Sequence, residues 1–267
     1  MRTPMRNRLL ALACAGLVLA TATAPAALAA TAPAPVSRVV TIDDRGSIVS
    51  ATLLARMSAE QVAAHLTGAK FPVPARPQGA DLYAVVYRTI SAAGTPTTAS
   101  GVVALPARSR KALWTVSYAH GTLATRAYAG SVADGDGRAA PLMFAAAGFA
   151  GVAPDYLGLG TGPGFHPYMD AATEASASAD LLRATGELAR RQGRSLSGDV
   201  LVTGFSQGGH AAMALGKSLR GDAAYRLRGS RRSPGRTTCG RPSCRRCWRT
   251  GSIRTAPPST WRTGRSR

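Results

Sequence analysis

The sequence predicts an α/β fold with a mostly parallel sheet and helices on both faces. Along the middle of the chain, short apolar strand patterns alternate with helical patterns, and such alternation requires right-handed crossovers between parallel strands. The 267 residues are 45% hydrophobic, which is enough for the core of one domain. A site is then expected at the carboxyl ends of the parallel strands.

The first elements predict an antiparallel start to the sheet. Residues 39–42 are a short strand candidate, and Ser58 and Gln61 form a capping box that opens a helix. Two β-rich runs, 82–90 and 97–105, flank a short turn that contains glycine and proline, and they predict a hairpin. Strands joined by so short a turn pair in the antiparallel sense.

The remaining elements alternate between strand and helix. Residue type and apolar periodicity predict strands at residues 113–118, 150–153 and 200–203, and helices near residues 141–147, 171–191 and 207–220. Asp180, in the long helix, is expected to be a solvated charge. The sequence contains no internal repeat.

The turn between the last strand and the last helix carries the clearest chemical signal. It reads Gly204-Phe205-Ser206-Gln207-Gly208-Gly209. A serine on a sharp strand-to-helix turn is held with its hydroxyl accessible, and the flanking glycines are needed because side chains there would clash. The helix N-terminus favours developing negative charge. The pattern predicts Ser206 as a nucleophile, and the alternative is an ordinary N-cap serine.

A second turn predicts an oxyanion hole beside Ser206. His120, Gly121 and Thr122 directly follow the strand at 113–118. The backbone amide of Gln207, together with that of Gly121 or Thr122, would stabilise a tetrahedral oxyanion. His120 is expected to be scaffold rather than base, and the alternative is a plain glycine turn with His120 packed against it.

These motifs resemble those of the bacterial secreted lipase/esterase-like α/β-hydrolases, a group related to secretory lipases. The resemblance covers residues 36–227, and the motifs that carry it are Ser117 to Thr122, Ala153 to Gly160, His166-Pro167-Tyr168 and Gly204 to His210. It implies the α/β-hydrolase fold and ester hydrolysis, in which a serine attacks the carbonyl, a histidine acts as base and then acid, and an Asp orients the histidine. No organic cofactor and no metal is expected.

The chain lacks the usual partners of such a serine. In this fold the acid and the histidine follow the nucleophile, but no histidine follows His210 and no carboxylate follows Asp222. His210 lies one helical turn beyond Ser206 and is not expected to reach it, and nothing in the sequence positions the imidazole of His166. Asp155, Tyr156 and His166 are possible substrate-pocket residues, and capping roles are equally open for the first two.

The first 29 residues predict a signal peptide. Arg2, Arg6 and Arg8 precede a short apolar run. Small residues up to Ala29 then form a cleavage site, and cleavage is expected near Ala29. The mature protein is therefore expected to be secreted. The run is too short to span a bilayer, so no membrane span is expected.

The last segment has a different composition from the rest. Residues 1–222 hold 20 basic and 13 acidic residues, whereas residues 223–267 hold 13 arginines and no acid. Residues 229–267 cannot bury enough apolar surface and are expected to be disordered. The composition favours a change of reading frame over a functional basic arm. Three cysteines, Cys239, Cys244 and Cys247, lack a fourth zinc ligand.

The sequence thus predicts an incomplete hydrolase domain over residues 30–228, with its C-terminal strands missing. The expected function is a secreted serine ester hydrolase for a small-molecule or lipid ester, inactive in this chain because the triad acid and histidine are absent. No specific nucleic-acid partner is expected. The alternatives are a secreted serine peptidase of the same fold and a cationic protein that binds nucleic acid or anionic surfaces.

Overall fold

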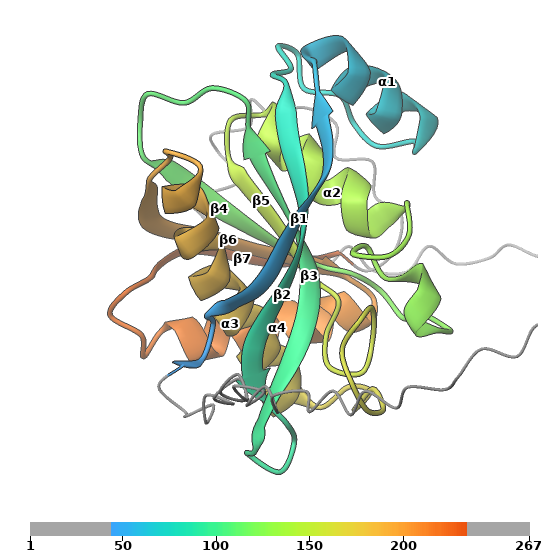
Figure 1. Ribbon diagram of the computed structural model, residues 1–267, viewed down its shortest axis with the longest axis vertical. Helices are drawn as coiled ribbons and strands as arrows, with labels where there is room; N and C mark the ends of the chain where they lie inside the picture. The colour runs from blue at the N-terminus through green and yellow to red at the C-terminus, as the bar shows by residue number, and fades with distance from the viewer. Residues whose placement is uncertain (1–43, 234–267) are drawn as a thin grey trace, which may run out of the picture. The chain divides into compact units, whose positions relative to one another are not determined.

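The structure is a computed structural model that describes residues 44–233 (Figure 1). Within these residues the strands form one mixed sheet in the order β1-β2-β3-β5-β4-β6-β7. The strands are β1 (Ile48–Met57), β2 (Ala80–Ile90), β3 (Pro96–Pro106), β4 (Leu113–Ala119), β5 (Ala150–Pro154), β6 (Leu196–Phe205) and β7 (Arg226–Ser233). The helices are α1 (Ala59–Gly68), α2 (Asp136–Ala146), α3 (Ala171–Arg191) and α4 (Gln207–Leu219), with a 3₁₀ turn at Arg126–Tyr128.

The pairing confirms the predicted α/β class. Strands β1, β2, β3 and β5 pair in the antiparallel sense, whereas β5, β4, β6 and β7 are parallel. The predicted hairpin is β2 and β3, which pair from Ile90 opposite Pro96 to Ala80 opposite Pro106. The parallel half places the ends of β4, β5 and β6 beside one another, where the site was expected.

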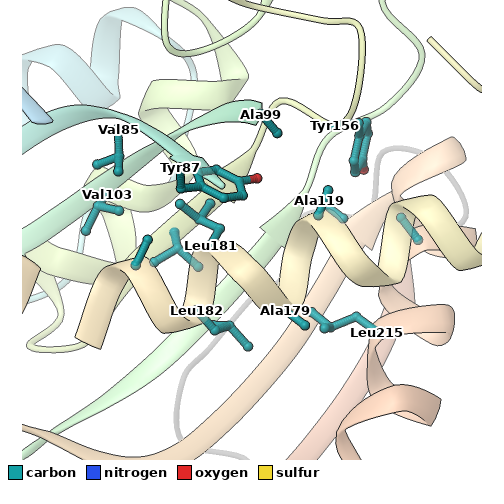
Figure 2. Packing of buried hydrophobic residues seen from close by; sticks show 14 of the residues in the cluster. Val85, Tyr87, Ala99, Val103, Ala119, Tyr156, Ala179, Leu181, Leu182 and Leu215 are labelled. Atoms are coloured by element: carbon teal, nitrogen blue, oxygen red, sulfur yellow. The ribbon is translucent and has the colours of Figure 1, made fainter. Parts of the chain in front are cut away.

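Two apolar clusters cover the two faces of the sheet. Alternation along β2 separates them, since Leu82 joins the cluster with α1 and α2, whereas Val85 and Tyr87 join the cluster with α3 and α4. Figure 2 shows Leu181 of α3 directed toward Tyr87. Each fully buried leucine of this kind contributes about 1.5–3 kcal/mol.

Local signals predicted several boundaries well. The capping box of α1 is present, with Ser58 N donating to Gln61 Oε1 at 2.8 Å. Helix α3 has its predicted bounds, and Asp170 caps it by accepting from Thr173 N at 2.8 Å. Helix α2 begins at Asp136, ahead of the predicted start at Pro141. Ala139 and Ala140 are both fully buried, and their burial stabilises the preceding turn despite the missing proline N–H.

Asp180 corrects the expectation of a solvated charge. Its side chain is fully buried, and it accepts from Arg45 Nε at 3.0 Å and from Thr89 Oγ1 at 2.7 Å. Arg183, one turn along α3, donates to its other oxygen. A buried carboxylate needs such partners because desolvation without them is costly. Periodicity alone did not reveal Arg45 and Thr89 as partners, because both lie far from α3 in the sequence.

The last strand extends beyond the boundary predicted at Arg228. Gly229 to Ser233 belong to β7 and pair with β6, so the expectation of disorder is wrong for these residues. Backbone hydrogen bonds to β6 hold this end of the strand, and Leu227 near its start packs against the apolar core. Arg226 and Arg228 add ion pairs to Asp199 of β6, with N–O distances of 3.0 and 2.6 Å.

Three other expectations concern the ends of the sheet and of the chain. Strand β1 at the sheet edge was not predicted, because its mostly exposed residues give little alternation. The strand predicted at 39–42, the signal peptide at 1–29 and residues 234–267 of the basic tail lie outside the described residues. Among the helices of residues 44–233, none has both the length and the apolar character to cross a membrane.

Candidate functional site

Ser206 occupies the sharp turn between β6 and α4. Strand β6 ends at Phe205 and α4 begins at Gln207, which leaves the serine alone between them with φ 54° and ψ −119°. A positive φ costs a residue with a side chain roughly 1–3 kcal/mol and is kept only where the surroundings impose it. The serine is exposed, and within residues 44–233 no hydrogen bond engages its hydroxyl.

Close backbone packing imposes this turn. A Cβ at Gly204 would lie 2.9 Å from the carbonyl oxygen of Ala119 and closer still to the backbone of Gly208. A Cβ at Gly208 would lie 2.6 Å from His120 O and would overlap the Ala119 carbonyl. The steric reason that the sequence suggested for both glycines is therefore present in the structure.

The turn after β4 lies directly against the turn that holds Ser206. Ala119 pairs with Gly204 across the parallel strands, and a Cβ at Gly121 would touch the Phe205 ring at 2.9 Å. Thr122 Oγ1 is 3.0 Å from the hydroxyl of Tyr168. The structure thus brings the turns that carry Gly121, Thr122 and Gln207 together beside Ser206. Their role as an oxyanion hole remains a prediction.

His120 is held on the inner side of this turn. Its side chain is buried, with Nδ1 at 2.7 Å from Gly121 O and Nε2 at 3.3 Å from Asp155 O. Its ring also packs on Tyr156, with 4.4 Å between ring centroids. A histidine whose two nitrogens both face carbonyl oxygens is suited to support the turn.

Asp155 and Tyr156, two of the predicted pocket residues, directly follow the end of β5 and are buried. The Asp155 carboxylate accepts from Ser100 Oγ at 2.6 Å and from Ser131 N at 3.3 Å. Tyr156 has φ 70° and donates its hydroxyl to His120 O at 3.1 Å. Burial raises the pKa of Tyr156 well above its usual value, so the hydroxyl stays a donor. Substrate contact by either side chain remains a prediction.

The third predicted pocket residue, His166, has a well-defined position. Its Nδ1 lies 3.0 Å from Leu157 O and its Nε2 lies 2.8 Å from the side-chain nitrogen of Gln207. The first contact requires an N–H on Nδ1, which leaves Nε2 as the acceptor. Sequence reasoning found no group that positions this imidazole, because the contact joins residues 41 positions apart.

Glu174 is the residue of this site that sequence reasoning missed. It lies in the first turn of α3 and is almost completely buried, with 1% exposure. Its Oε1 accepts from Gln207 Nε2 at 2.9 Å and its Oε2 accepts from His210 Nδ1 at 2.7 Å. An acid in a first turn is common at any helix, so the sequence offered no signal that this one reaches α4.

Residues 44–233 hold no candidate metal cluster, and one hollow of this part of the chain lies beside α4. No cluster of His, Cys, Asp or Glu suited to hold a metal ion occurs within residues 44–233. A hollow of about 370 Å³ lies between α4 and β7, and its lining includes His210, Met213, Lys217 and Ser230 but not Ser206.

Several solved structures are similar to this chain. A protein of Legionella pneumophila that is provisionally assigned as a hydrolase is 31% identical, with a TM-score of 0.60 over 66% of this chain and 48% of that one. The rice cell wall degrading esterase LipA of Xanthomonas oryzae is 31% identical, with a TM-score of 0.57 over 67% of this chain and 47% of that one. Its ligand-bound form is 30% identical, with a TM-score of 0.58 over 68% and 48% of the two chains.

The chain therefore spans about half the length of the solved structures it matches. No protein-family model matches it, and neither does any curated protein. Its mostly parallel sheet with helices on both faces matches the α/β-hydrolase fold of esterases, which confirms the predicted fold.

Proposed function

We propose that the chain is a serine ester hydrolase of the lipase/esterase type, in which Ser206 attacks the ester carbonyl and forms an acyl-enzyme. One observation carries the proposal. Ser206 is held at φ 54° on the strand-to-helix turn, exposed and without a hydrogen bond to its hydroxyl in the described part of the chain. This is the geometry that a nucleophilic serine requires. Esterases among the structural neighbours support the same reaction.

The tetrahedral intermediate would be stabilised beside the same turn. The Gln207 amide at the N-terminus of α4 and an amide of Gly121 or Thr122 would donate to the oxyanion. Each such donor is typically worth about 2.7–4 kcal/mol. The first turn of α4 contains no acidic residue, so no carboxylate of that turn opposes the developing charge.

The general base and its orienting acid are assigned to no residue. No histidine follows His210 in the sequence. His166 has both ring nitrogens engaged, and the Nδ1 of His210 is bound to Glu174. We therefore propose that the chain as printed reacts slowly with esters, while retaining the nucleophile and the oxyanion donors.

The test separates acylation from turnover. The exported chain would be incubated with a fluorophosphonate probe, which modifies nucleophilic serines, and then hydrolysis of p-nitrophenyl butyrate would be followed. We expect slow labelling that is lost in Ser206→Ala, together with little ester turnover. Labelling that survives Ser206→Ala would refute the nucleophile. Cleavage of a peptide amide in preference to the aryl ester would favour a peptidase.

A further inference from the structure

We propose that the loop from Tyr156 to Asp170 is a clamp that positions both sides of the oxyanion hole, with His166 and Tyr168 as its positioning residues. The proposal rests on the function proposed above and adds residues to the same site. His166 contacts Gln207 on one side, and Tyr168 contacts Thr122 on the other. One loop thus contacts a residue from each of the two predicted donor segments.

The contact on the Gln207 side has only one consistent hydrogen-bond arrangement. Gln207 is 2% exposed, and its side-chain nitrogen lies 2.8 Å from His166 Nε2 and 2.9 Å from Glu174 Oε1. Both neighbours are acceptors, so the two N–H groups of the amide are used. The rotated amide would point its oxygen at the Glu174 carboxylate, which repels it. His166 must therefore carry its proton on Nδ1.

Glu174 fixes this arrangement from beneath. Its buried carboxylate accepts from Gln207 and, through its other oxygen, from His210 Nδ1 at 2.7 Å. Both donors belong to α4, so the carboxylate ties the first turn of that helix to α3. A buried polar group without a partner costs free energy, and Gln207 Oε1 already lacks one among the described residues. Loss of the His166 acceptor would therefore leave one side-chain N–H of Gln207 without a partner. The backbone amide of the same residue is one of the predicted oxyanion donors.

The contact on the Thr122 side is linked to the first by a row of ring contacts, of which one is tilted, one stacked and one edge-on. His120, Tyr156, His166 and Tyr168 follow one another with centroid separations of 4.4, 5.8 and 6.1 Å. The Tyr168 hydroxyl, at the exposed end, lies 3.0 Å from Thr122 Oγ1. Since His120 and Thr122 belong to the same turn, this row of rings leads from that turn through the loop and back to it.

The loop has its own restraints, as a clamp requires. Arg126 donates to Gly162 O at 3.2 Å and to Gly164 O at 2.7 Å. Gly158 has φ 72°, and a Cβ there would approach Phe165 O to 2.5 Å. These contacts hold the loop on the N-terminal side of His166, and on the other side the N–H of Tyr168 donates to His166 O at 2.9 Å. His166 is thus presented to Gln207 from a fixed backbone.

The first experiment reads the proton on His166 without any reference to activity. Long-range ¹H–¹⁵N correlation spectra of the exported chain distinguish the two imidazole tautomers, and loss of one set of signals in His166→Gln assigns them. We expect the Nδ1–H tautomer near neutral pH. The Nε2–H tautomer would overturn the clamp, because Nε2 could then not accept from Gln207.

The second experiment measures the rate at which the fluorophosphonate modifies Ser206. We expect His166→Ala and Tyr168→Phe each to lower this rate about tenfold, since one donor is displaced rather than removed. His166→Gln should restore most of the rate, because its terminal amide oxygen can reach the place of Nε2. Tyr128→Phe removes an exposed hydroxyl that has no hydrogen bond in the described residues and should leave the rate unchanged.

The outcomes separate the clamp from the proposed function. Circular dichroism and thermal unfolding would show that each variant is folded. A folded His166→Ala with the parent rate would overturn the clamp, as would equal rates for His166→Ala and His166→Gln. A parent chain that is never labelled would count against Ser206 as nucleophile, and the tautomer measurement would then decide the clamp alone.

Discussion

Replacing Gly208 by alanine tests the packing that holds Ser206 in place. A Cβ at Gly208 would overlap the backbone carbonyl of Ala119 and lie 2.6 Å from His120 O. Backbone atoms at the end of β4 cannot rotate away as a flexible side chain can. The substitution must therefore move the turn after β4 away from the start of α4, which separates the two predicted oxyanion donors.

The expected loss of stability follows from two opposing terms. Alanine is favoured over glycine in a helix by roughly 0.5–1 kcal/mol. Overpacking costs about 1–3 kcal/mol where neighbours can adjust, and the overlap with two carbonyl groups places this site at or above the upper end. The net loss is then about 2 kcal/mol or more. For a domain of this size that lowers the melting temperature by roughly 4–8 °C.

Gly216 is the matched control on the same helix. A Cβ there would meet Ser230 Cβ at 3.5 Å, an ordinary van der Waals contact. Gly216→Ala should therefore leave the protein as stable as the parent or slightly more stable. Thermal unfolding followed by circular dichroism at 222 nm would compare the three chains. Equal melting temperatures for Gly208→Ala and Gly216→Ala would refute the packing argument.

Three further predictions concern pH and export. Arg226, and then Arg228, hold the pKa of the Asp199 carboxyl well below its usual range. The ion pairs of Asp199 with these arginines therefore stabilise the fold above about pH 4, and this stabilisation is lost as the pH falls further. Asp199→Asn should flatten the fall in urea midpoint below pH 4, and an unchanged slope would contradict this. Burial raises the pKa of Tyr225 to about 12. The neutral Tyr225 hydroxyl therefore contributes to stability below about pH 10, and this contribution is lost as the pH rises toward 12. Tyr225→Phe should reduce that alkaline loss, which the same titration measures. N-terminal sequencing of exported protein should show cleavage near Ala29, whereas a start at Met1 would contradict the signal peptide.

The features that the sequence predicted correctly depend on neighbours along the chain. The capping box of Ser58 and Gln61 joins residues three positions apart, and the hairpin of β2 and β3 joins adjacent strands. The turn around Ser206 is equally local, since Gly204 and Gly208 flank the serine. Such patterns are visible in order along the sequence, because short segments largely decide caps and turns.

Other features depend on which distant segments meet. Residues 229–233 were expected to be disordered, yet their backbone pairs with β6, and Arg226 and Arg228 just before them meet Asp199. The sequence predicted Asp180 to be a solvated charge, whereas the structure pairs it with Arg45 and Thr89 from distant parts of the chain. In both cases the stabilising groups lie outside the segment whose composition was considered.

The neighbourhood of Ser206 divides in the same way. Gly204, Ser206 and Gly208 could be found from their spacing alone, because strand, turn and helix follow one another in the chain. The contacts of Gln207 with Glu174 and His166 span 33 and 41 positions and join α4 to α3 and to a loop. Side chains so far apart become partners only after the sheet has brought their elements together, so only the tertiary structure identifies Glu174 and orients His166.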